Sequence, residues 1–429
     1  MTAALDPVLF TKAQISDLEP VRRPLRILIV SQYFPPEIGA TQTRMQAFAE
    51  FLAARGHRVT VICEFPNHPH GVIPDEYRGR FLEDDRSNRY RVLRVWVKAN
   101  PEKTRSSRMA FYLSFMGMAA SAAPLAGRAD VVLATTPPLF AGAAGLAIAR
   151  LNIAPLVLDV RDLWPAAAIG LNEISPGWTL RIAEALERRL YKSAAAVVAV
   201  TRPFCTHVDR IRGRPPQTVM IPNGTLERFF APRGDKQARA RLGVEPDRFL
   251  VTFAGTHGIA QGLPAALAAA ARADEIHFAF IGEGPEKRGL VASARERGLP
   301  NVSFHSQLPL EEIPAVLAAS DALLVPLSAH PTFADFVPSK LFDFMAAGRP
   351  VILSARGEAA RIVESAGAGV VVEPENPDAL ARGANWLAEH AQEASEMGKR
   401  GQVFARTRLR RVQAERVERV LVHVARSRR

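Results

Sequence analysis

The segment that begins at Asp335 combines charged side chains with the pattern of a helix start. Its residue pattern predicts a loop that ends at Pro338, then a helix with an apolar face, a stop at Gly348 and a strand. Ser339 stands where the N-cap of that helix is expected. The free amide groups and the positive dipole end of such a helix start are suited to a diphosphate.

Charged side chains flank the predicted helix start. Lys340 falls in the first turn, where its charge opposes the helix dipole, so a bound anion beside it would be favourable. Asp343 follows one turn later, and its carboxylate can accept hydrogen bonds from ribose hydroxyls. Alternatively, Asp335 and Asp343 have no chemical role and are merely a loop residue and a neighbour of the helix cap. The complete pattern favours a function.

Strands and helices alternate along the chain, and this alternation must position those groups. A strand at 26–30, a helix at 41–54 and a strand at 57–63 form the first expected βαβ unit. Three further apolar runs are expected to be parallel strands buried on both faces: 131–135, 156–160 and 195–200.

A second α/β set is expected to begin near Thr218, after a break between residues 201 and 217. Its expected strands are 249–254, 277–281, 302–305, 322–326, 350–353 and 369–372. Two sets predict two doubly wound parallel-sheet domains that face a cleft, with ligands at the carboxyl ends of the strands. The expected division is a lead-in at 1–24, domains at 25–210 and 211–400, and a closing helix at 401–429.

The chain resembles family 4 of the retaining glycosyltransferases. Asp335 and Asp343 keep the family's spacing of two acidic residues with seven others between them, although the family usually has glutamates there. A small-residue helix and the strand opening Gly348-Arg-Pro350-Val follow, as in the family. The segment Pro-Ser-Lys-Leu-Phe-Asp-Phe-Met-Ala-Ala-Gly is similar to a subgroup that builds O-antigen, capsule and colanic-acid-type polysaccharides. The resemblance implies a GT-B fold of two Rossmann-like domains with a C-terminal closing helix.

The resemblance assigns the nucleotide sugar to the domain at 211–400. Glycines in two loops after strands would let backbone amides approach the phosphates: Gly255, Gly258, Gly282 and Gly284. Ser306 and Leu308 lie in the segment whose backbone holds the base edge in the family. Gln261 stands where relatives place a lysine, so Lys340 is expected to compensate the diphosphate charge and, with Asp335, to be catalytic. Ser339 and Asp343 complete the donor-binding residues, whereas His305 is more often a structural histidine.

The resemblance assigns the acceptor to the domain at 25–210. Gly39 matches the family's glycine loop, which brings the end of the first strand close to the donor pyrophosphate or the acceptor. Relatives often carry His-Asp at Arg161-Asp162, where the aspartate would position the acceptor hydroxyl as a catalytic residue and the arginine would pair with it or a phosphate. An internal ion pair that only holds the loop is equally consistent. His68 and His70 are candidate acceptor-binding residues in a loop that can equally be merely polar.

The composition excludes several other classes of protein. A hydrophobic share of 48% and a charged share of 23% indicate packed cores rather than disorder. The two cysteines, Cys63 and Cys205, are expected to be buried thiols, which argues against disulfides and structural zinc. Glu83-Asp84-Asp85 resembles a solvated charged loop rather than a metal motif, so neither a metal nor a cofactor is expected. The net charge of +12 favours anionic lipid or phosphorylated ligands over nucleic acid, since no recognition fold for nucleic acid is evident.

Two apolar or basic segments bear on the location of the protein. The run at 109–126 is slightly short for a bilayer span, so it is a core helix or an interfacial helix, and its basic flank favours the interface. The arginine-rich segment at 406–429 is expected to be a solvated closing helix that packs through four aliphatic residues, Val412, Val417, Val420 and Leu421. A cytoplasmic protein, peripheral on the inner face of the cell membrane, is therefore expected.

Together these features predict a metal-independent glycosyltransferase of surface polysaccharide synthesis. By resemblance, it moves an N-acetylated hexose or 6-deoxyhexosamine from a UDP-sugar to a polyprenyl-diphosphate-linked saccharide with retention. A nucleotide-sugar 2-epimerase of the same fold is the alternative, and it would need neither an acceptor nor membrane contact. A dinucleotide oxidoreductase is disfavoured, because no Gly-x-Gly-x-x-Gly follows the first strand.

Overall fold

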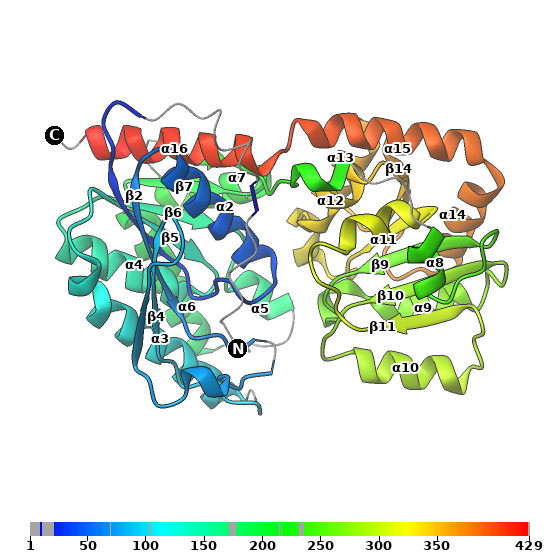
Figure 1. Ribbon diagram of the computed structural model, residues 1–429, viewed down its shortest axis with the longest axis horizontal. Coiled ribbons are helices and arrows are strands. Elements are labelled where there is room, and N and C mark those ends of the chain that lie inside the picture. The colour runs from blue at the N-terminus through cyan, green and yellow to red at the C-terminus, as the bar shows by residue number, and fades with distance from the viewer. Residues whose placement is uncertain are drawn as a thin grey trace. The chain divides into compact units, whose positions relative to one another are not determined.

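The computed structural model describes residues 9–10, 21–68, 70–102, 104–170, 177–213, 215, 217–230 and 236–427. The chain divides into two compact units (Figure 1). The first contains Met1–Pro222 together with Arg410–Arg429, and the second contains Asn223–Leu409. Each unit is built around one twisted sheet, so the predicted class of two Rossmann-like α/β domains is confirmed.

The first unit contains an eight-stranded sheet in the order β3-β4-β2-β1-β5-β6-β7-β8. Its strands are β1 (Arg26–Val30), β2 (Arg58–Glu64), β3 (Leu82–Asp85), β4 (Arg91–Val95), β5 (Val131–Thr136), β6 (Leu156–Val160), β7 (Ala196–Ala199) and β8 (Val219–Met220). All neighbours pair in parallel except β3, which pairs antiparallel with β4. The central strands are almost completely buried because helices cover both of their faces, which is why they consist of apolar residues throughout.

Helices of the first unit pack in two groups against this sheet. They are α2 (Ala40–Ala54), the short 3₁₀ helix η1 (Asp75–Tyr77), α3 (Arg105–Ala126), α4 (Leu139–Leu151), α5 (Ala166–Gly170), α6 (Trp178–Ser193), α7 (Arg202–Arg212) and α16 (Arg410–Arg426). Helix α2 packs against α16, whereas α3, α4 and α6 pack against one another in succession (Figure 1). The C-terminal helix α16 therefore belongs to the first unit. It buries Val417 and Leu421 and leaves Val412 and Val420 half-buried.

The second unit contains a six-stranded parallel sheet in the order β11-β10-β9-β12-β13-β14. Its strands are β9 (Phe249–Ala254), β10 (Ile276–Ile281), β11 (Val302–His305), β12 (Ala322–Pro326), β13 (Val351–Ser354) and β14 (Gly369–Val372). Its helices are η2 (Glu227–Phe230), α8 (Lys236–Arg241), η3 (Ile259–Gln261), α9 (Leu263–Ala270), α10 (Lys287–Glu296), α11 (Ile313–Ala319), η4 (Pro331–Asp335), α12 (Lys340–Ala346), α13 (Glu358–Ala366), α14 (Pro377–Glu389) and α15 (Ala391–Arg406). Buried Phe253, Phe278 and Phe280 contribute to its core, which holds the loops at the strand ends in place.

Several expectations about individual segments were wrong. The segment near Thr218 does not open the second α/β set, because β8 pairs with β7 at the edge of the first sheet. Glu83, Asp84 and Asp85 do not form a loop but strand β3, and neither β3 nor β4 was predicted. Cys63 is buried as expected, whereas Cys205 is only half-buried.

The lead-in at 1–24 lies largely outside the described residues, but two of its residues are well packed. Leu9 and Phe10 are buried, and both of their amides donate to the carboxylate of Glu50 on α2, at 3.1 to 3.2 Å. At this point the N-terminal segment is not loose, because a buried carboxylate fixes it to the first unit.

Helix α3 has two different faces. Phe115, Ala119, Ala122 and Ala123 are buried at helical spacing, whereas large apolar residues on the other side are exposed. The part from Ser106 to Ala126 is long and apolar enough to cross a membrane, yet it packs along the sheet beside α4. The helix is therefore a surface helix of the domain with an uncovered apolar side.

Candidate functional site

The predicted donor-binding loops of the second unit meet at the carboxyl ends of neighbouring strands. The chain runs outward from β9 in one direction and from β12 in the other, so the loop after β9 stands at the switch point where open α/β sheets bind ligands. The amide of Gly255 donates to the carbonyl of Ile281, at 2.9 Å, and that of Gly282 to the carbonyl of His305, at 3.1 Å. These two bonds join the ends of β9, β10 and β11.

Three of the predicted glycines allow these loops to approach one another. Gly255, Gly282 and Gly284 have φ angles of 146°, 135° and 155°, which L side chains rarely adopt. A Cβ atom at Gly282 would overlap the carbonyl of Gly255, and one at Gly284 would overlap the backbone of His257. The contacts explain why glycine stands here, and the approach of these loops to a phosphate stays a prediction.

The ammonium group of Lys340 lies beside the first of these loops. Its Nζ is buried and has no hydrogen-bond partner among the residues described. It lies 3.9 Å from the centroid of the Phe253 ring, which provides a cation–π contact. Burial lowers the pKa of Lys340 to about 7, because the charged form loses its hydration. An anionic ligand here would supply the missing hydrogen bonds and stabilise the charged form.

A histidine that the sequence analysis did not single out lies in the same place. The side chain of His257 is fully buried, and neither ring nitrogen has a partner in the described part of the chain. Burial, with smaller effects of Lys287 and Lys340, lowers the pKa of His257 to about 4. The ring is therefore neutral at pH 7 and has one N–H donor and one acceptor available. Three phenylalanine rings surround it: Phe253, Phe280 and Phe304.

A second lysine, also missed, ties two loops together. Nζ of Lys287 donates to the carbonyls of Gly282 and His305, both at 2.9 Å, and forms an ion pair with Glu283 at 2.7 Å. The hydrogen bond from Lys287 lowers the pKa of Glu283, and the predicted donor-binding residue Ser306, which hydrogen-bonds the same carboxylate, adds a smaller effect. The i,i+4 spacing of Glu283 and Lys287 was the available signal in the sequence.

The predicted helix start is present, but Ser339 does not cap it. Helix α12 begins at Lys340, and Ser339 has helical backbone angles and makes no side-chain capping bond. A serine with helical angles cannot turn its hydroxyl back to the following amides as an N-cap does. The amide of Leu341 donates to the carbonyl of Pro338, and the amides of Ser339 and Lys340 have no acceptor among the described residues. Asp343 lies half-buried in the first turn.

The remaining predicted donor residues have less distinctive surroundings. Asp335 is exposed at the end of η4, and Leu308 is half-buried in the loop after β11. Gly258 has an ordinary negative φ, and its Cβ position is 3.0 Å from the side chain of Gln261, so its environment requires glycine less strictly. Within the described part of the chain, neither Asp335 nor Leu308 forms a hydrogen bond or ion pair with Lys340, and their roles stay predictions.

In the first unit, the glycine loop after β1 organises the loop that carries the two predicted histidines. Oε1 of Glu37 accepts hydrogen bonds from the amides of Asn67, at 2.6 Å, and His68, at 2.7 Å. Gly39 directly precedes α2, and its carbonyl accepts from the amide of Thr43 at 3.0 Å. Burial raises the pKa of Glu37, although these amides partly oppose the shift.

A pocket of about 170 Å³ lies between these loops and α3. Its lining includes Tyr33, His68, Arg108 and Tyr112. The imidazole of His68 is 6.1 Å from the ring of Tyr33, centroid to centroid. His70 is exposed and does not line the pocket. The structure thus associates one of the two predicted histidines with a small pocket that has both aromatic and basic groups.

The expected ion pair between Arg161 and Asp162 does not form. The guanidinium of Arg161 donates instead to Thr135 and to the carbonyl of Pro137, both at 2.7 Å, so it holds the loop after β5. Oδ1 of Asp162 is buried and has no partner within the described chain. Burial raises the pKa of Asp162 to about 7, against a smaller opposing effect of Arg161. The purely structural interpretation of Asp162 as half of an ion pair is therefore wrong.

The acid that does form an ion pair is Asp159, which lies within strand β6 just before Arg161 and Asp162. It is fully buried and receives two hydrogen bonds from Arg44, at 2.8 and 3.0 Å. The same guanidinium donates to the carbonyls of Ile221 and Pro222. A buried pair with these further bonds fixes β6, α2 and the segment after β8, which leaves Arg161 and Asp162 in a defined place.

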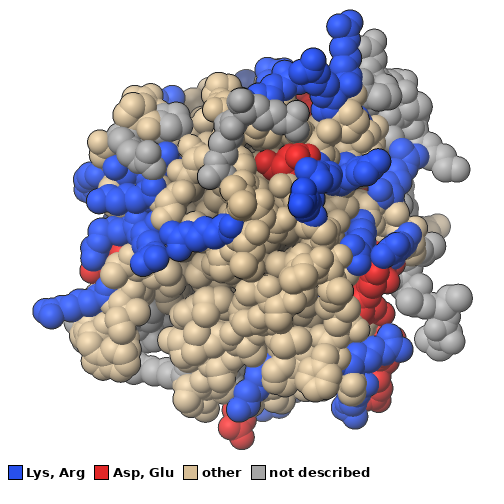
Figure 2. Space-filling view, turned by 90° about the vertical axis from the view of Figure 1, so that its left-hand side faces the viewer, with Lys and Arg blue, Asp and Glu red and all other residues tan. Residues whose placement is uncertain are grey.

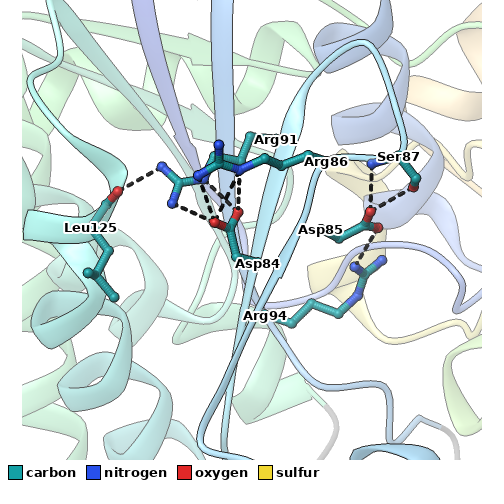
Figure 3. A network of polar contacts seen from close by, with 7 residues as sticks. All are labelled: Asp84, Asp85, Arg86, Ser87, Arg91, Arg94 and Leu125. Atoms are coloured by element: carbon teal, nitrogen blue, oxygen red, sulfur yellow. Dashed lines mark hydrogen bonds and ion pairs between the residues drawn. The ribbon is translucent and has the colours of Figure 1, made fainter.

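The acidic run at 83–85 is engaged by arginines (Figure 3). Asp84 accepts from Arg91 at 2.7 Å and from Arg86 at 2.9 Å, while Asp85 accepts from Ser87 and from Arg94. The hydrogen bonds from Arg91 and Arg86 lower the pKa of Asp84 to about 2. Within the described ranges, no group of three or more His, Cys, Asp or Glu side chains is arranged to hold a metal ion.

Two family models match the chain in succession. The glycosyl transferase 4-like domain matches residues 39–224, and the glycosyl transferases group 1 domain matches residues 235–404. Among curated relatives, WcaI of Escherichia coli (strain K12), named as a glycosyl transferase of colanic acid biosynthesis, is 25% identical over 88% of this chain and 96% of its own. The GDP-mannose-dependent alpha-(1-6)-phosphatidylinositol monomannoside mannosyltransferase of Mycolicibacterium smegmatis is 26% identical over 88% of this chain and 93% of its own.

Solved structures agree on the fold. HepE of Anabaena in complex with UDP is 19% identical, covers 93% of this chain and all of its own, and has a TM-score of 0.69. The sucrose-phosphate synthase of Thermosynechococcus elongatus is 19% identical over 93% of this chain and 99% of its own, with a TM-score of 0.73. The resemblance to family 4 is thus confirmed: the chain belongs to the GT-B glycosyltransferases that join a glycosyl transferase 4-like domain to a group 1 domain.

Proposed function

We propose that this enzyme transfers a sugar from a UDP-sugar to a polyprenyl-diphosphate-linked saccharide, with retention and without a metal ion. The observation that carries the proposal is the buried ammonium of Lys340, which lacks a partner in the described chain and lies against Gly255 and Phe253. A buried cation without a partner costs stability, and a diphosphate that binds beside it would offset that cost.

On the donor side, Lys340 would stabilise the charge that develops on the departing diphosphate. The amides of Ser339 and Lys340 provide additional donors at the same helix start, and Gly255 keeps the approach open. Lys340 and Asp335 are the catalytic residues proposed here, with Asp335 placed toward the donor sugar. Gly258, Gly282, Gly284, Ser306, Leu308, Ser339 and Asp343 are the further donor-binding residues.

On the acceptor side, Asp162 would position the acceptor hydroxyl. Its buried carboxylate oxygen has no other described partner, and Arg161 holds the adjacent loop. In this mechanism the leaving phosphate takes the acceptor proton on the same face of the sugar, so the protein needs orientation and charge stabilisation more than a strong base. His68, His70 and Arg161 are the acceptor-binding residues proposed here, and Gly39 is proposed as a donor-binding residue of the first unit.

The identity of the donor's nucleotide is inferred from related proteins. HepE was solved with UDP-glucose and with UDP, whereas the mannosyltransferase of Mycolicibacterium smegmatis is named for GDP-mannose. The chain is also 31% identical, over 51% of its length, to the D-rhamnosyltransferase WbpZ of Pseudomonas aeruginosa. We favour a UDP-linked N-acetylated hexose or 6-deoxyhexosamine, following the subgroup that the segment around Lys340 resembles.

We further propose that the enzyme lies on the cytoplasmic face of the membrane through α3. Met109, Leu113 and Leu125 are 43%, 44% and 55% exposed on that helix, and Arg108 stands near its start. An amphipathic surface helix with a basic end is suited to the interface of an anionic bilayer. Flotation with anionic liposomes at low salt tests this, and protein that stays at the bottom of the gradient contradicts it.

The transfer itself is tested by incubating the full chain with UDP-sugars or GDP-sugars, with and without a polyprenyl-diphosphate-saccharide. We expect release of UDP that requires the acceptor and a glycolipid product whose anomeric configuration matches the donor's. Conversion of the nucleotide sugar without an acceptor would instead support the 2-epimerase alternative. Release of GDP alone would overturn the assignment of the nucleotide.

A further inference from the structure

A second, larger pocket lies in the first unit, away from Arg161 and Asp162. Its volume is about 1000 Å³, and Leu156, Ala196 and Val219 line it, each the first residue of its strand. Arg161 follows the other end of β6, which is five residues long, so roughly 16 Å of strand separates the two places. The pocket is therefore distinct from the predicted acceptor site.

The walls of this pocket are apolar and its entrance is basic. Leu146 and Ala149 from α4 line it together with Val420 and Val424 from α16. Three basic side chains also line it, all of them exposed: Arg150, Arg419 and His423. No aspartate or glutamate is among the described residues that line it. An apolar interior with this charge at its edge is complementary to an amphipathic anion.

The arginines differ in how far they are already engaged. Arg419 contacts Glu415 on the same helix, whereas Arg150 stands exposed in the last turn of α4. Figure 2 shows the side on which α4 and the end of α16 lie in Figure 1. On it, a broad uncharged surface is bordered mostly by Lys and Arg, with few acidic residues.

A strained apolar residue stands at the edge of the pocket. Ile153 has a φ of 52°, a conformation that β-branched residues avoid, and its side chain is 81% exposed. Leu151 beside it is 68% exposed. The strained backbone therefore holds the large apolar side chain of Ile153 in solvent at the edge of an apolar pocket, and Leu151 lies close by in the sequence. Contact with a hydrocarbon chain would remove both side chains from water.

We propose that this pocket binds one hydrocarbon chain of an anionic phospholipid, with its phosphate at Arg150 and Arg419. The volume falls in the range of about 300–1000 Å³ that is typical of small-molecule sites. Each methylene that enters the pocket adds to the affinity, and a guanidinium can hold a phosphate through two parallel hydrogen bonds. The inference does not depend on sugar transfer, because the pocket contains none of the residues proposed for it.

The test uses the full chain and dodecyl phosphate, below its micelle concentration, in isothermal titration. We expect one molecule to bind, and Val420→Trp, which fills the pocket from its half-buried wall, to weaken binding at least about tenfold. Val412→Trp is the matched control, because Val412 is a half-buried valine of the same helix outside the pocket. The affinity of Val412→Trp for dodecyl phosphate should equal that of the wild type. Equal binding by wild type and Val420→Trp, with both variants folded by circular dichroism, overturns the proposal.

The role of charge is tested separately with the double variant Arg150→Glu/Arg419→Glu. It should bind dodecyl phosphate about tenfold more weakly and bind dodecanol as the wild type does, since only the phosphate contacts are reversed. Arg181→Glu, an exposed arginine of α6 outside the pocket, is the control. Equal losses for both ligands overturn the phosphate assignment. Sedimentation equilibrium adds a further check: a dimer that Val420→Trp dissociates would identify a second copy of the chain as the occupant instead.

Discussion

The side chain of Lys340 occupies the space that a Cβ atom would need at Gly255. From that position Nζ lies 2.5 Å away and Cε 3.0 Å away. The ring of Phe253 lies 3.9 Å from the same nitrogen, so the ammonium lies between an aromatic face and a glycine backbone. This arrangement links the first glycine loop to the start of α12 within one unit, and it makes both residues testable.

Gly255→Ala should weaken UDP binding about tenfold and lower the unfolding midpoint by a few degrees. The new methyl group displaces the ammonium, and alanine is strained at a φ of 146°. Titration calorimetry and thermal unfolding measure the two effects. Gly289→Ala on α10 is the control, because nothing lies within 4 Å of its Cβ position. The proposed contact is refuted if Gly255→Ala binds UDP as tightly as that control.

Lys340→Met should lower turnover about 100-fold while the unfolding midpoint stays the same or rises. The substitution removes the group that stabilises the leaving diphosphate, and it also removes a buried amine without a described partner, which costs stability in the free protein. Steady-state kinetics and thermal unfolding separate these effects. Lys399→Met, an exposed lysine paired with Glu396, should change neither. A parallel loss of activity and midpoint in Lys340→Met would make the lysine structural.

Much of the fold follows from the sequence, because strands buried on both faces must be apolar throughout. Polar edge strands do not carry that signal: β3 contains three acids whose partners come from β4 and the turn, and only pairing shows that Asp84 belongs to a strand. The two-residue strand β8 is too short to indicate which sheet it joins.

Residues of the candidate site could be predicted from the sequence where the local secondary structure alone fixes their position. Lys340 stands in the first turn of a helix, which is visible in the sequence. The burial of His257 and the bridging role of Lys287 depend on loops from three strands, and no local pattern shows them. For the same reason the sequence could not show that the buried ion pair here joins Arg44 to Asp159, while Arg161 and Asp162 do not pair with each other.

Asp162→Asn should make the enzyme more stable at pH 8, by an amount on the order of 2 kcal/mol. The folded pKa of Asp162 is about 7, above its unfolded value of about 3.9. The folded state therefore binds more protons between these values, and the contribution of Asp162 to stability falls as pH rises from about 4 to 7. Denaturant unfolding across this range should show a steeper fall of stability with rising pH in the wild type than in Asp162→Asn.

The same variant tests the acceptor role. If the ionised carboxylate positions the hydroxyl, Asp162→Asn should reduce kcat/KM for the acceptor at pH 8 by about tenfold or more. The KM for the donor should stay the same. Unchanged acceptor kinetics would assign Asp162 to the scaffold.

Treatment with EDTA should leave the transfer rate unchanged. Lys340 is proposed to supply the positive charge that a divalent ion supplies in other transferases, and Asp84 and Asp85 are engaged by arginines. The rate is measured after gel filtration, with and without added Mg²⁺ or Mn²⁺. Loss of activity that only the metal restores contradicts the proposed metal independence.

The most direct test of the account follows the titration of Lys340 itself, by NMR of the full chain with isotope-labelled lysine and Lys340→Met for assignment. Free protein should show a pKa near 7, and saturating UDP should raise it, because the diphosphate stabilises the ammonium. UDP affinity should then fall as pH rises above about 7, with proton uptake on binding. A lysine that titrates near its ordinary value of about 10.4, or whose pKa UDP does not change, would contradict the central claim.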